Sequence, residues 1–399
     1  MDNSVTKTAI IIHPDLGIGG AERLVVDLAL ALEHEDYDVK FYTSHHDKKH
    51  CFPETNGRFQ VFVHGDFIPM TIFGYFYIFL ATIRALYLAF VAAWKSNADL
   101  YIVDQISVGV PILKLFNKKV LFYCHHPDKL LVKKGGFMKR MYRKPFDWIE
   151  EKAMSFADTI VVNSLYTQTV YEKAFPSHSS TPQVLYPTYN PILEEENQDE
   201  KSPFEEEVTE EFMFVSINRY EGKKNHDVAI SALNELPEDL RGNVRVVIAG
   251  GFDDRVIENI EVYKYLESLA KKLGVEHHVT LIKNFTNPER EYLLKRATAV
   301  LYTPPYEHFG IVPLEAMIKN VPVIACNNGG PLETVQDGIT GMLCDGSPKG
   351  FAQCITKMCN DKELRENLKQ NAKNETKKKF GFETFTRNVI NVVNNILAH

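Results

Sequence analysis

The sequence predicts an α/β protein with two doubly wound domains, each built on a parallel sheet, and three observations lead to this prediction. The chain has 399 residues, of which 45% are hydrophobic and 24% charged, so it is too long for one ordinary α/β domain and comfortable for two. Strand-like apolar runs alternate with helical patterns in two separate series, as in parallel sheets covered by helices. Residues 191–211 are rich in acidic side chains and lie between the two series, as a linker would.

The first series predicts a domain over residues 1–190. Its strands are expected at Ala9–His13, Val39–Thr43, Phe59–His64, Leu100–Asp104, Val120–Cys124 and Thr159–Asn163. Its helices are expected at Ala21–Glu33 and Phe146–Ala157. Ligands of open parallel sheets bind beyond the carboxyl ends of the strands, so functional side chains are expected just after each strand.

The second series predicts a domain over residues 212–380. Its strands are expected at Phe212–Ile217, Val244–Gly250, Val279–Ile282, Ala299–Tyr302, Pro322–Cys326 and Gly341–Cys344, and its helices at Asn225–Leu236, Tyr263–Leu273 and Glu289–Arg296. Residues 381–399 are expected to form a helix with one apolar face, which packs back on the first domain.

Composition disfavours several classes of protein. A net charge of −7 argues against nucleic-acid binding. The six cysteines show no CxxC spacing and no His/Cys cluster, so reduced thiols are expected and no zinc site. The DxD match Asp36-Tyr37-Asp38 falls between a helix and a strand, at the wrong edge of the sheet for a metal, and is expected to be a turn. The first residues lack the basic and long apolar regions of a signal peptide, which predicts domains that face the cytosol.

The segment 67–95 is unusual because it is almost entirely apolar and aromatic, interrupted at Arg84. A spanning helix needs about 20 apolar residues, and an arginine at mid-bilayer is costly. We therefore expect a helix in or against the membrane interface, with Arg84 and Lys95 at the level of the headgroups. A buried core helix is the alternative, and a true membrane span is less favoured than either.

A glycine-rich turn, Gly17–Gly20, follows the first predicted strand and opens a helix. Gly19 and Gly20 would let the backbone approach a ligand closely, and free N–H groups at a helix start attract anions. The motif is not GxGxxG and no acidic residue follows at the expected spacing, so a nicotinamide site is disfavoured. Taken alone, the turn is equally consistent with a tight strand–helix connection.

Arg219 and Lys224 lie between the end of a predicted strand and the start of a helix. Two cations at this place can hold a diphosphate and stabilise the charge that grows on it as it leaves. A solvated charge cluster is the alternative.

Glu307 and Glu315 flank a glycine turn that opens another predicted helix. The backbone N–H groups of Phe309, Gly310 and Ile311 can bind phosphate, and the two carboxylates can accept hydrogen bonds from sugar and ribose hydroxyls. A glycosidase pair fits less well, because its carboxyl groups must face each other across the scissile bond.

Two shorter signals complete the candidate site. Gly329 and Gly330 follow the strand Pro322–Cys326 and would let the backbone crowd a donor sugar. His125 follows the strand Val120–Cys124, where an imidazole can polarise a hydroxyl or stabilise developing positive charge. His126 is expected to be structural.

A basic, partly aromatic segment forms a local positive patch in this acidic protein. It could meet phospholipid headgroups or the diphosphate of an acceptor, although solvated surface charge is the alternative. Its cations are Lys129, Lys133, Lys134, Lys139, Arg140, Arg143 and Lys144.

Together these motifs resemble those of the retaining glycosyltransferases of family 4, which have the GT-B fold with two Rossmann-like domains facing across a cleft. The resemblance covers nearly the whole chain, and the joint occurrence of the motifs in this order is specific. Within the family, local segments are similar to the dolichol-pathway α-1,3/1,6-mannosyltransferases, although those enzymes usually have an aromatic residue in place of His126. These segments are Phe122–Asp128, Phe146–Glu151, Ser216–Glu221 and Tyr302–Met317.

The resemblance implies roles for the candidate residues. Arg219 and Lys224 should bind the diphosphate of GDP, Glu315 the ribose hydroxyls and Glu307 the hydroxyls of the donor sugar. By the same resemblance, the Gly19–Gly20 pair should lie under the diphosphate and the reacting sugar, and His125 near the reacting face of that sugar.

The implied activity is transfer of mannose from GDP-mannose to a dolichyl-diphosphate-linked oligosaccharide, on the cytosolic face of the endoplasmic reticulum membrane. No cofactor or metal is implied, because in such enzymes the leaving diphosphate is thought to accept the proton of the acceptor. Membrane lipid and other dolichol-pathway glycosyltransferases are the implied partners. The alternatives are a family 4 enzyme that uses a UDP-sugar and a non-catalytic membrane scaffold.

Overall fold

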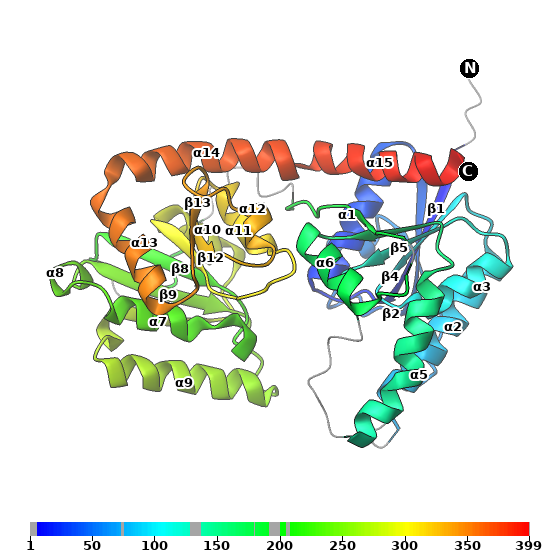
Figure 1. The fold of residues 1–399 in the computed structure, drawn as a ribbon, viewed down its shortest axis with the longest axis horizontal. Helices are drawn as coiled ribbons and strands as arrows, with labels where there is room; N and C mark the ends of the chain where they lie inside the picture. Colours follow the sequence, from blue (N-terminus) through cyan, green and yellow to red (C-terminus); the bar gives the residue numbers. More distant parts are fainter. Residues whose placement is uncertain are drawn as a thin grey trace. The chain divides into compact units, whose positions relative to one another are not determined.

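The computed structural model describes residues 6–72, 76–127, 137–178, 180–190, 200–204 and 208–398 (Figure 1). The chain divides into two compact units. The first unit consists of Met1–Thr188 together with Phe382–His399, and the second is Tyr189–Gly381. The division therefore falls just before the acidic segment, and the last helix belongs to the first unit.

The first unit is built on a seven-stranded parallel sheet with the order β3-β2-β1-β4-β5-β6-β7. The order reverses between β1 and β4, whose residues Ile11 and Ile102 are register partners. The strands are β1 (Thr8–Asp15), β2 (Asp38–His45), β3 (Gln60–Val63), β4 (Leu100–Asp104), β5 (Val120–Cys124), β6 (Thr159–Val162) and β7 (Gln183–Val184).

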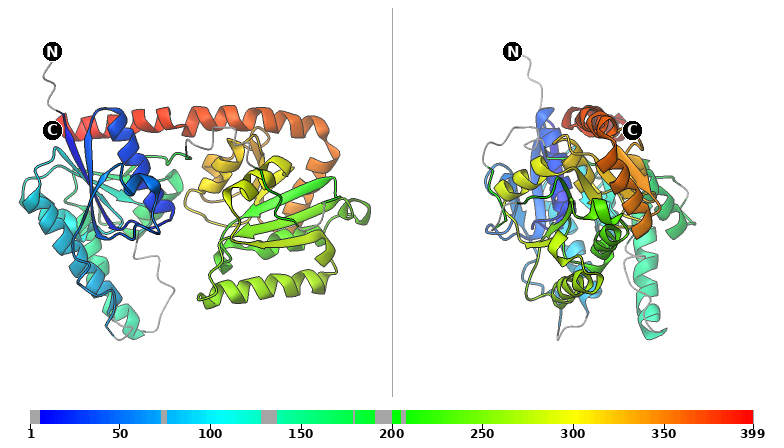
Figure 2. Two further views of the ribbon diagram at one scale, coloured as in Figure 1. Left: turned by 180° about the vertical axis from the view of Figure 1, so that it is seen from behind. Right: turned by 90° about the vertical axis from the view of Figure 1, so that its left-hand side faces the viewer.

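Helices cover both faces of this sheet (Figure 2). The side chains of β1 alternate between the two faces. Ala9 and Ile11 pack with α1 (Gly20–His34) and α15 (Phe382–Ala398), whereas Ile10 and Ile12 pack with α2 (Tyr77–Lys95) on the opposite face. The remaining helices of this unit are α3 (Val110–Leu115), α5 (Phe137–Met154) and α6 (Leu165–Ala174).

The second unit has a six-stranded parallel sheet with the order β10-β9-β8-β11-β12-β13, which reverses between β8 and β11. The strands are β8 (Phe212–Ile217), β9 (Val244–Gly250), β10 (Val279–Lys283), β11 (Ala299–Tyr302), β12 (Val323–Cys326) and β13 (Gly341–Cys344). The helices are α7 (His226–Asn234), α8 (Glu238–Arg241), α9 (Ile257–Leu273), α10 (Asn287–Arg296), α11 (Ile311–Met317), α12 (Pro331–Thr334), α13 (Pro348–Asn360) and α14 (Lys362–Phe380).

The sequence predicted most strands correctly from their apolar runs, and it predicted the helices less completely. The bounds of β4, β5 and β8 are those predicted, and the turn predicted at Asp36 is present, with a φ of 60°. The helix predicted from Phe146 begins instead at Phe137 and contains Pro145, a residue that usually ends helices. The helices α3, α6, α13 and α14 were not predicted.

The apolar segment 67–95 does not form one helix, since α2 begins at Tyr77. The prediction that Arg84 lies at headgroup level is wrong. Its side chain is only 10% exposed, and its Nη2 donates to the carbonyl oxygen of Ser44 at 3.1 Å inside the first unit. The charge therefore lies on the inner face of the helix, whereas Lys95 is exposed.

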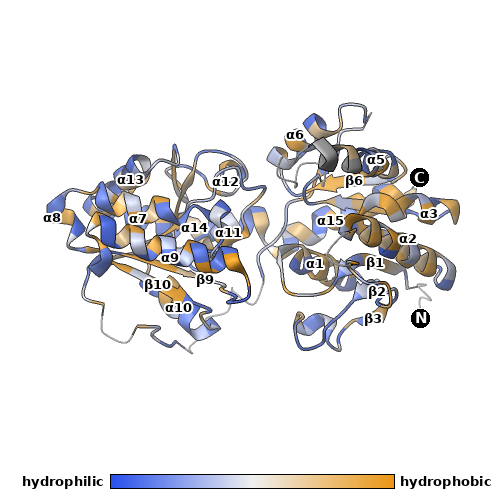
Figure 3. Ribbon diagram, turned by 90° about the horizontal axis from the view of Figure 1, so that it is seen from below, coloured by the Kyte–Doolittle hydropathy of each residue, from blue (hydrophilic) through white to orange (hydrophobic). Residues whose placement is uncertain are grey.

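The outer face of α2 remains apolar. Figure 3 shows this helix coloured mostly as hydrophobic, and Trp94 is 72% exposed. Within the described part of the chain, α2 alone has the length and composition of a membrane-crossing helix, and 39% of its most apolar window is buried. A helix buried to that extent fits neither a fully enclosed core helix nor a helix surrounded by lipid.

Replacing Ile396 with Ala should lower the free energy of unfolding by about 2–5 kcal/mol, because it leaves a cavity under α15. Ile396 is 3% exposed and packs in the core that α1 and α15 share. Denaturant unfolding measures the change, with Asn395→Ala on the exposed side of the same helix as the control. Equal transition midpoints for the two variants would contradict this packing.

Candidate active site

The second unit gathers its candidate residues where its strand order reverses. Arg219 and Lys224 follow β8, and Glu307 follows the neighbouring strand β11. A reversal of strand order leaves a crevice at the carboxyl ends of the strands, and open α/β sheets bind ligands there.

Lys224 and Glu307 form an ion pair at the centre of this edge. Lys224 Nζ donates to Glu307 Oε2 at 2.6 Å, and the two side chains are 13% and 26% exposed. Thr303, just past β11, donates to the carbonyl oxygen of Lys224 at 2.7 Å and fixes the short 3₁₀ turn Gly222–Lys224. Burial would raise the pKa of Glu307, but the charge and hydrogen bond of Lys224 outweigh it and lower that pKa. At neutral pH the site therefore holds a carboxylate acceptor beside an ammonium donor.

Arg219 does not join this pair. Its side chain is 67% exposed, and its Nη1 lies 3.1 Å from Glu221 Oε1. Lys223 Nζ contacts the other oxygen of Glu221 at 3.0 Å. Glu221 is 15% exposed but keeps Lys223 as a second partner, and an ion pair with an exposed guanidinium contributes little free energy. The guanidinium can therefore leave Glu221 for a ligand at low cost.

Glu315 has a different partner, which the sequence did not suggest. Arg290 on α10 donates through Nη2 to Glu315 Oε2 at 2.6 Å, and the side chains are 17% and 21% exposed. Glu307 and Glu315 are thus held by separate cations. Arg290 carries no motif of its own, so only its ion pair with Glu315 in the structure shows its role.

The glycines of this edge are required by the protein's own backbone. Gly310 precedes α11 with a φ of 85°, and Gly329 has a φ of 65°, a region that only glycine adopts freely. A Cβ on Gly330 would lie 2.4 Å from the carbonyl oxygen of Phe309, and its N–H donates to the carbonyl oxygen of Glu307 at 2.7 Å. The loops after β11 and β12 therefore pack directly on each other. The expected contact of Gly329 and Gly330 with a donor sugar remains a prediction.

Helix α11 begins at Ile311 without a side-chain cap. Its first backbone N–H groups accordingly have no capping side chain to satisfy them, which is compatible with the predicted phosphate contacts of Phe309, Gly310 and Ile311.

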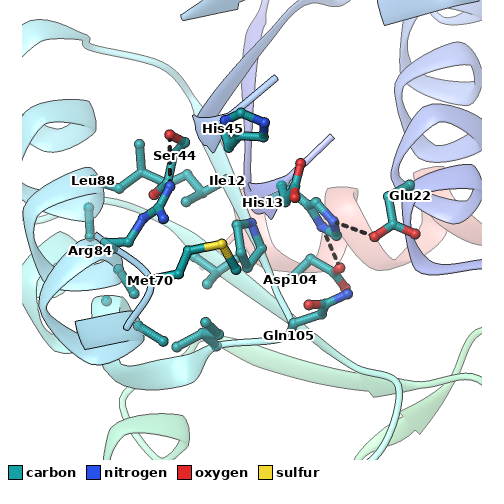
Figure 4. A pocket seen from close by; sticks show the side chains of 18 of the residues that line it. Ile12, His13, Glu22, Ser44, His45, Met70, Arg84, Leu88, Asp104 and Gln105 are labelled. Atoms are coloured by element: carbon teal, nitrogen blue, oxygen red, sulfur yellow. Dashed lines mark hydrogen bonds and ion pairs between the residues drawn. The ribbon is translucent and has the colours of Figure 1, made fainter. Parts of the chain in front are cut away.

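The first unit has a second cluster at its own reversal point, and the sequence pointed to only one of its members. Asp104, the last residue of β4, accepts a hydrogen bond from His13 Nδ1 at 2.8 Å on one side. On the other side, its Oδ1 lies 2.8 Å from His125 Nε2, just past β5. Glu22 on α1 lies 3.5 Å from His13 Nε2 and extends the chain (Figure 4). Both His13 and Asp104 lie at the carboxyl ends of correctly predicted strands, and that position was the signal that could have found them.

The charges in this cluster stabilise one another. Burial opposes ionisation of Asp104, but His125 and His13 outweigh it and hold its pKa at about 2. Burial would also lower the pKa of His13, but hydrogen bonds to Asp104 and Glu22 raise it to about 9. At neutral pH the cluster therefore contains a buried imidazolium between two carboxylates, and Asp104 fixes the ring of His125.

The other predicted residues of the first unit are placed as follows. His126 lies beside His125 and its Nδ1 contacts the carbonyl oxygen of Pro127 at 2.7 Å, as a structural side chain would. Gly19 caps α1 in extended conformation, and the space beside Gly20 is open, since an added Cβ would meet no atom within 4 Å. Their predicted contact with a diphosphate remains a prediction.

The basic patch falls largely outside what can be described. Lys133 and Lys134 lie outside the described residues, and Lys139, Arg140 and Arg143 lie on α5, where only the backbone is described.

No group of three or more His, Cys, Asp or Glu side chains in the described ranges is arranged to hold a metal ion. All six cysteines are free thiols and five are buried.

The pH dependence of stability tests the His13 cluster. The pKa of His13 is raised from 6.5 to about 9. Its contribution to the free energy of unfolding is therefore complete below pH 6.5 and is lost as the pH rises through 9. Between pH 6.5 and pH 9.5, the free energy of unfolding of wild type should fall by on the order of 3 kcal/mol, and this fall should be absent in His13→Gln. Asp104 acts in the opposite direction, because its stabilisation is present above pH 4 and is lost as the pH falls through about 2.

The matched control for that experiment is His34→Gln, which removes an exposed histidine of the same unit. A pH slope that is the same in wild type and His13→Gln would argue against the protonated, paired state of His13.

Comparisons with known proteins agree with this architecture. The family described as Glycosyltransferase Family 4 matches residues 18–191, and that described as Glycosyl transferases group 1 matches residues 197–375. The chain is similar over 98% of its length to the structure of sucrose-phosphate synthase from Thermosynechococcus elongatus, with 99% of that chain covered, a TM-score of 0.77 and 18% identity, which supports the GT-B fold alone.

Relatives at higher identity define the family more narrowly. The α-1,3/1,6-mannosyltransferase ALG2 of Rhizomucor pusillus is 41% identical, covering 96% of this chain and 90% of the relative. The enzyme of the same name from Homo sapiens is 40% identical, covering 99% and 98%. The paired cations and carboxylates at the β8–β11 edge, the two-unit GT-B fold and these identities together show that the chain belongs to the ALG2 family of α-1,3/1,6-mannosyltransferases, within family 4 of the glycosyltransferases.

Proposed function

We propose that this protein transfers mannose from GDP-mannose to a dolichyl-diphosphate-linked oligosaccharide, forming α-1,3 and α-1,6 linkages. The observation that carries the proposal is the Lys224–Glu307 ion pair at the β8–β11 reversal, in a chain that belongs to a mannosyltransferase family. A second nucleotide-sugar chemistry has no specific observation in its favour.

The second unit is proposed to bind the donor. Lys224 is already fixed by Glu307 and Thr303, so its ammonium loses little freedom when it contacts the diphosphate. Its three N–H donors allow it to keep Glu307 while it contacts phosphate oxygens. Arg219 then leaves Glu221 to supply the second positive charge, and the two cations stabilise the negative charge that grows on the departing GDP.

The carboxylates select the ligand. Glu307 is ionised beside Lys224, so it can only accept hydrogen bonds, and the mannose hydroxyls are suitable donors. Glu315 is fixed by Arg290 and is proposed to accept from the ribose hydroxyls. Neither residue acts as a nucleophile in this proposal. The acceptor oxygen forms the bond to the anomeric carbon on the face from which GDP departs, as the bond from that carbon to the diphosphate breaks, and the departing diphosphate takes the proton of the acceptor hydroxyl.

The first unit is proposed to act on the reacting sugar and the acceptor. Asp104 orients His125, whose ring can then hydrogen-bond a sugar hydroxyl near the developing positive charge. The open space beside Gly20 leaves room for the diphosphate and the sugar at the start of α1, whereas the carboxylate of Glu22 lies beside Gly19.

We further propose that the reaction takes place on the cytosolic face of the endoplasmic reticulum membrane, without a metal. The exposed apolar residues of α2 and the basic residues Lys133, Lys134, Lys139, Arg140 and Arg143 would contact membrane lipid there. The same proposal includes association with other dolichol-pathway glycosyltransferases. It does not include binding to nucleic acid.

The test is incubation of the purified protein with GDP-mannose and a phytanyl-diphosphate chitobiose that carries one mannose, followed by linkage analysis of the product. Wild-type protein should yield both linkages, and excess UDP-glucose should not compete. Product formed equally well from a UDP-sugar, or intact GDP binding without turnover, would contradict the proposal.

Lys224→Ala and Glu307→Gln should each reduce kcat by about 10²–10³-fold, the loss typical of removing one group that stabilises a transition state. Lys223→Ala is the matched control, because this neighbouring lysine is 68% exposed and paired only with Glu221 in the described structure. Full activity in Glu307→Gln would remove the role given to that carboxylate, and an equal loss in Lys223→Ala would show that the effect is not specific.

A further inference from the structure

The first unit contains a cavity of about 170 Å³ between α2 and the carboxyl ends of β1, β2 and β4 (Figure 4). Its wall is polar on one side, where His13, Glu22 and Asp104 lie, and apolar on the α2 side. The helix contributes one continuous stripe to that wall, formed by Tyr77, Ala81, Arg84, Ala85, Leu88 and Ala89.

The cation in this stripe is incompletely compensated. Arg84 is 9% exposed, yet its acidic neighbour Asp66 is 54% exposed and lies 3.5 Å away. Its one closer contact in the described residues is the uncharged carbonyl oxygen of Ser44 at 3.1 Å. Both hydrogen bonds use Nη2, whereas a guanidinium has five N–H donors. A buried charge is costly unless a partner charge offsets it, so the site suits an additional anion.

The mouth of the cavity suits an apolar chain. Met70 and Tyr77 line it, although they are 54% and 55% exposed. Phe79 and Phe90, which are 48% and 47% exposed, lie on the opposite face of α2, because the helix has 3.6 residues per turn. The exposed apolar surface at the mouth is therefore that of Met70 and Tyr77.

We propose that this cavity binds the diphosphate and the first isoprenoid unit of the acceptor, with Arg84 as the cation that holds the diphosphate. The inference rests on the proposed function, in which the acceptor is a polyisoprenyl-diphosphate-linked sugar. It assigns the charge of the acceptor to α2, a different place from the basic segment of α5.

The size of the cavity agrees with the apolar part of this ligand. A cavity of about 150 Å³ holds a benzene molecule, so a cavity of about 170 Å³ has room for one branched five-carbon unit. The carboxylates of Asp15, Glu22 and Asp104 would repel phosphate from the opposite wall, whereas they can accept hydrogen bonds from the sugar that follows the diphosphate. Among the cavity-lining cations, Arg84 is the one on the apolar wall.

Binding of short analogues to the full-length purified protein tests the site directly. Farnesyl diphosphate should bind at least about tenfold more tightly than farnesol or inorganic diphosphate, because only the first carries both groups. Arg84→Gln should bind farnesyl diphosphate about tenfold more weakly than wild type, and farnesol almost as tightly. The affinity of Arg84→Lys for farnesyl diphosphate should lie in between. Ala85→Leu fills the apolar wall and should weaken farnesyl diphosphate and farnesol alike.

Two control variants separate these effects from general damage. Thr82→Leu enlarges a side chain on the same helix outside the cavity, and Arg58→Gln removes an exposed arginine of the same unit. Neither should change binding, and GDP should bind all variants as it binds wild type. If Arg84→Gln fails to fold, Arg84→Lys and Ala85→Leu still decide the outcome.

Several results would overturn the inference. Unchanged farnesyl diphosphate binding in Arg84→Gln and Ala85→Leu is one. Equal binding of inorganic diphosphate and farnesyl diphosphate would indicate a simple anion site, and competition by phosphatidylserine vesicles would indicate lipid headgroups instead.

Turnover distinguishes this inference from the proposed function. If both hold, Arg84→Gln should raise KM for the lipid acceptor about tenfold and leave KM for GDP-mannose unchanged. Absence of mannose transfer in wild type, with tight farnesyl diphosphate binding, would contradict the function and leave the site intact. Normal transfer with unchanged acceptor KM in the variants would contradict the site alone.

Discussion

Each sheet reverses its strand order once, between β1 and β4 in the first unit and between β8 and β11 in the second, and the functional side chains depend on this reversal. On either side of such a point the crossover helices pack on opposite faces, so no connection covers the carboxyl ends of the two central strands. His13 and Asp104 occupy one of these openings, and Lys224 and Glu307 occupy the other. The same constraint that produces a parallel sheet therefore brings together residues that are about 80–90 positions apart in the chain.

Both openings contain charges that are arranged in advance. Asp104 is fully buried and is held ionised by two histidines, and Glu307 is held ionised by Lys224. In a site with little water such charges interact strongly, and they need no reorganisation when a ligand arrives. Arg219 and Arg84 differ from them, because the first is exposed and the second has an incomplete partner. In the proposed function, the fixed charges would lie near the reacting sugar, and the cations with weaker partners would contact the phosphates.

Sequence patterns predicted the strands because a buried parallel strand is a short apolar run, and β4, β5 and β8 have the predicted bounds. The motifs and the family resemblance placed Lys224 and Glu307 in one donor site, but the direct pairing of the two side chains was not predicted. Sequence patterns could not predict that Glu315 pairs with Arg290 or that His13 pairs with Asp104, because pairing across a sheet depends on strand order. Arg84 was misplaced for a related reason. An apolar helix has the same composition whether its charged residue faces lipid or the interior. Here the contacts of Arg84 with Ser44 and Asp66 place the charge in the interior.

The place of α15 has a consequence for how the protein is made. This helix completes the core of the first unit beside α1, yet the whole of the second unit is translated before it. At 5–20 residues per second the ribosome needs on the order of tens of seconds for that stretch. During this time α15 is not yet available to cover the apolar face of α1, whereas the second unit can already fold. The first domain to emerge is thus the last to be finished, and the emerging chain presents a surface that chaperones would be expected to recognise.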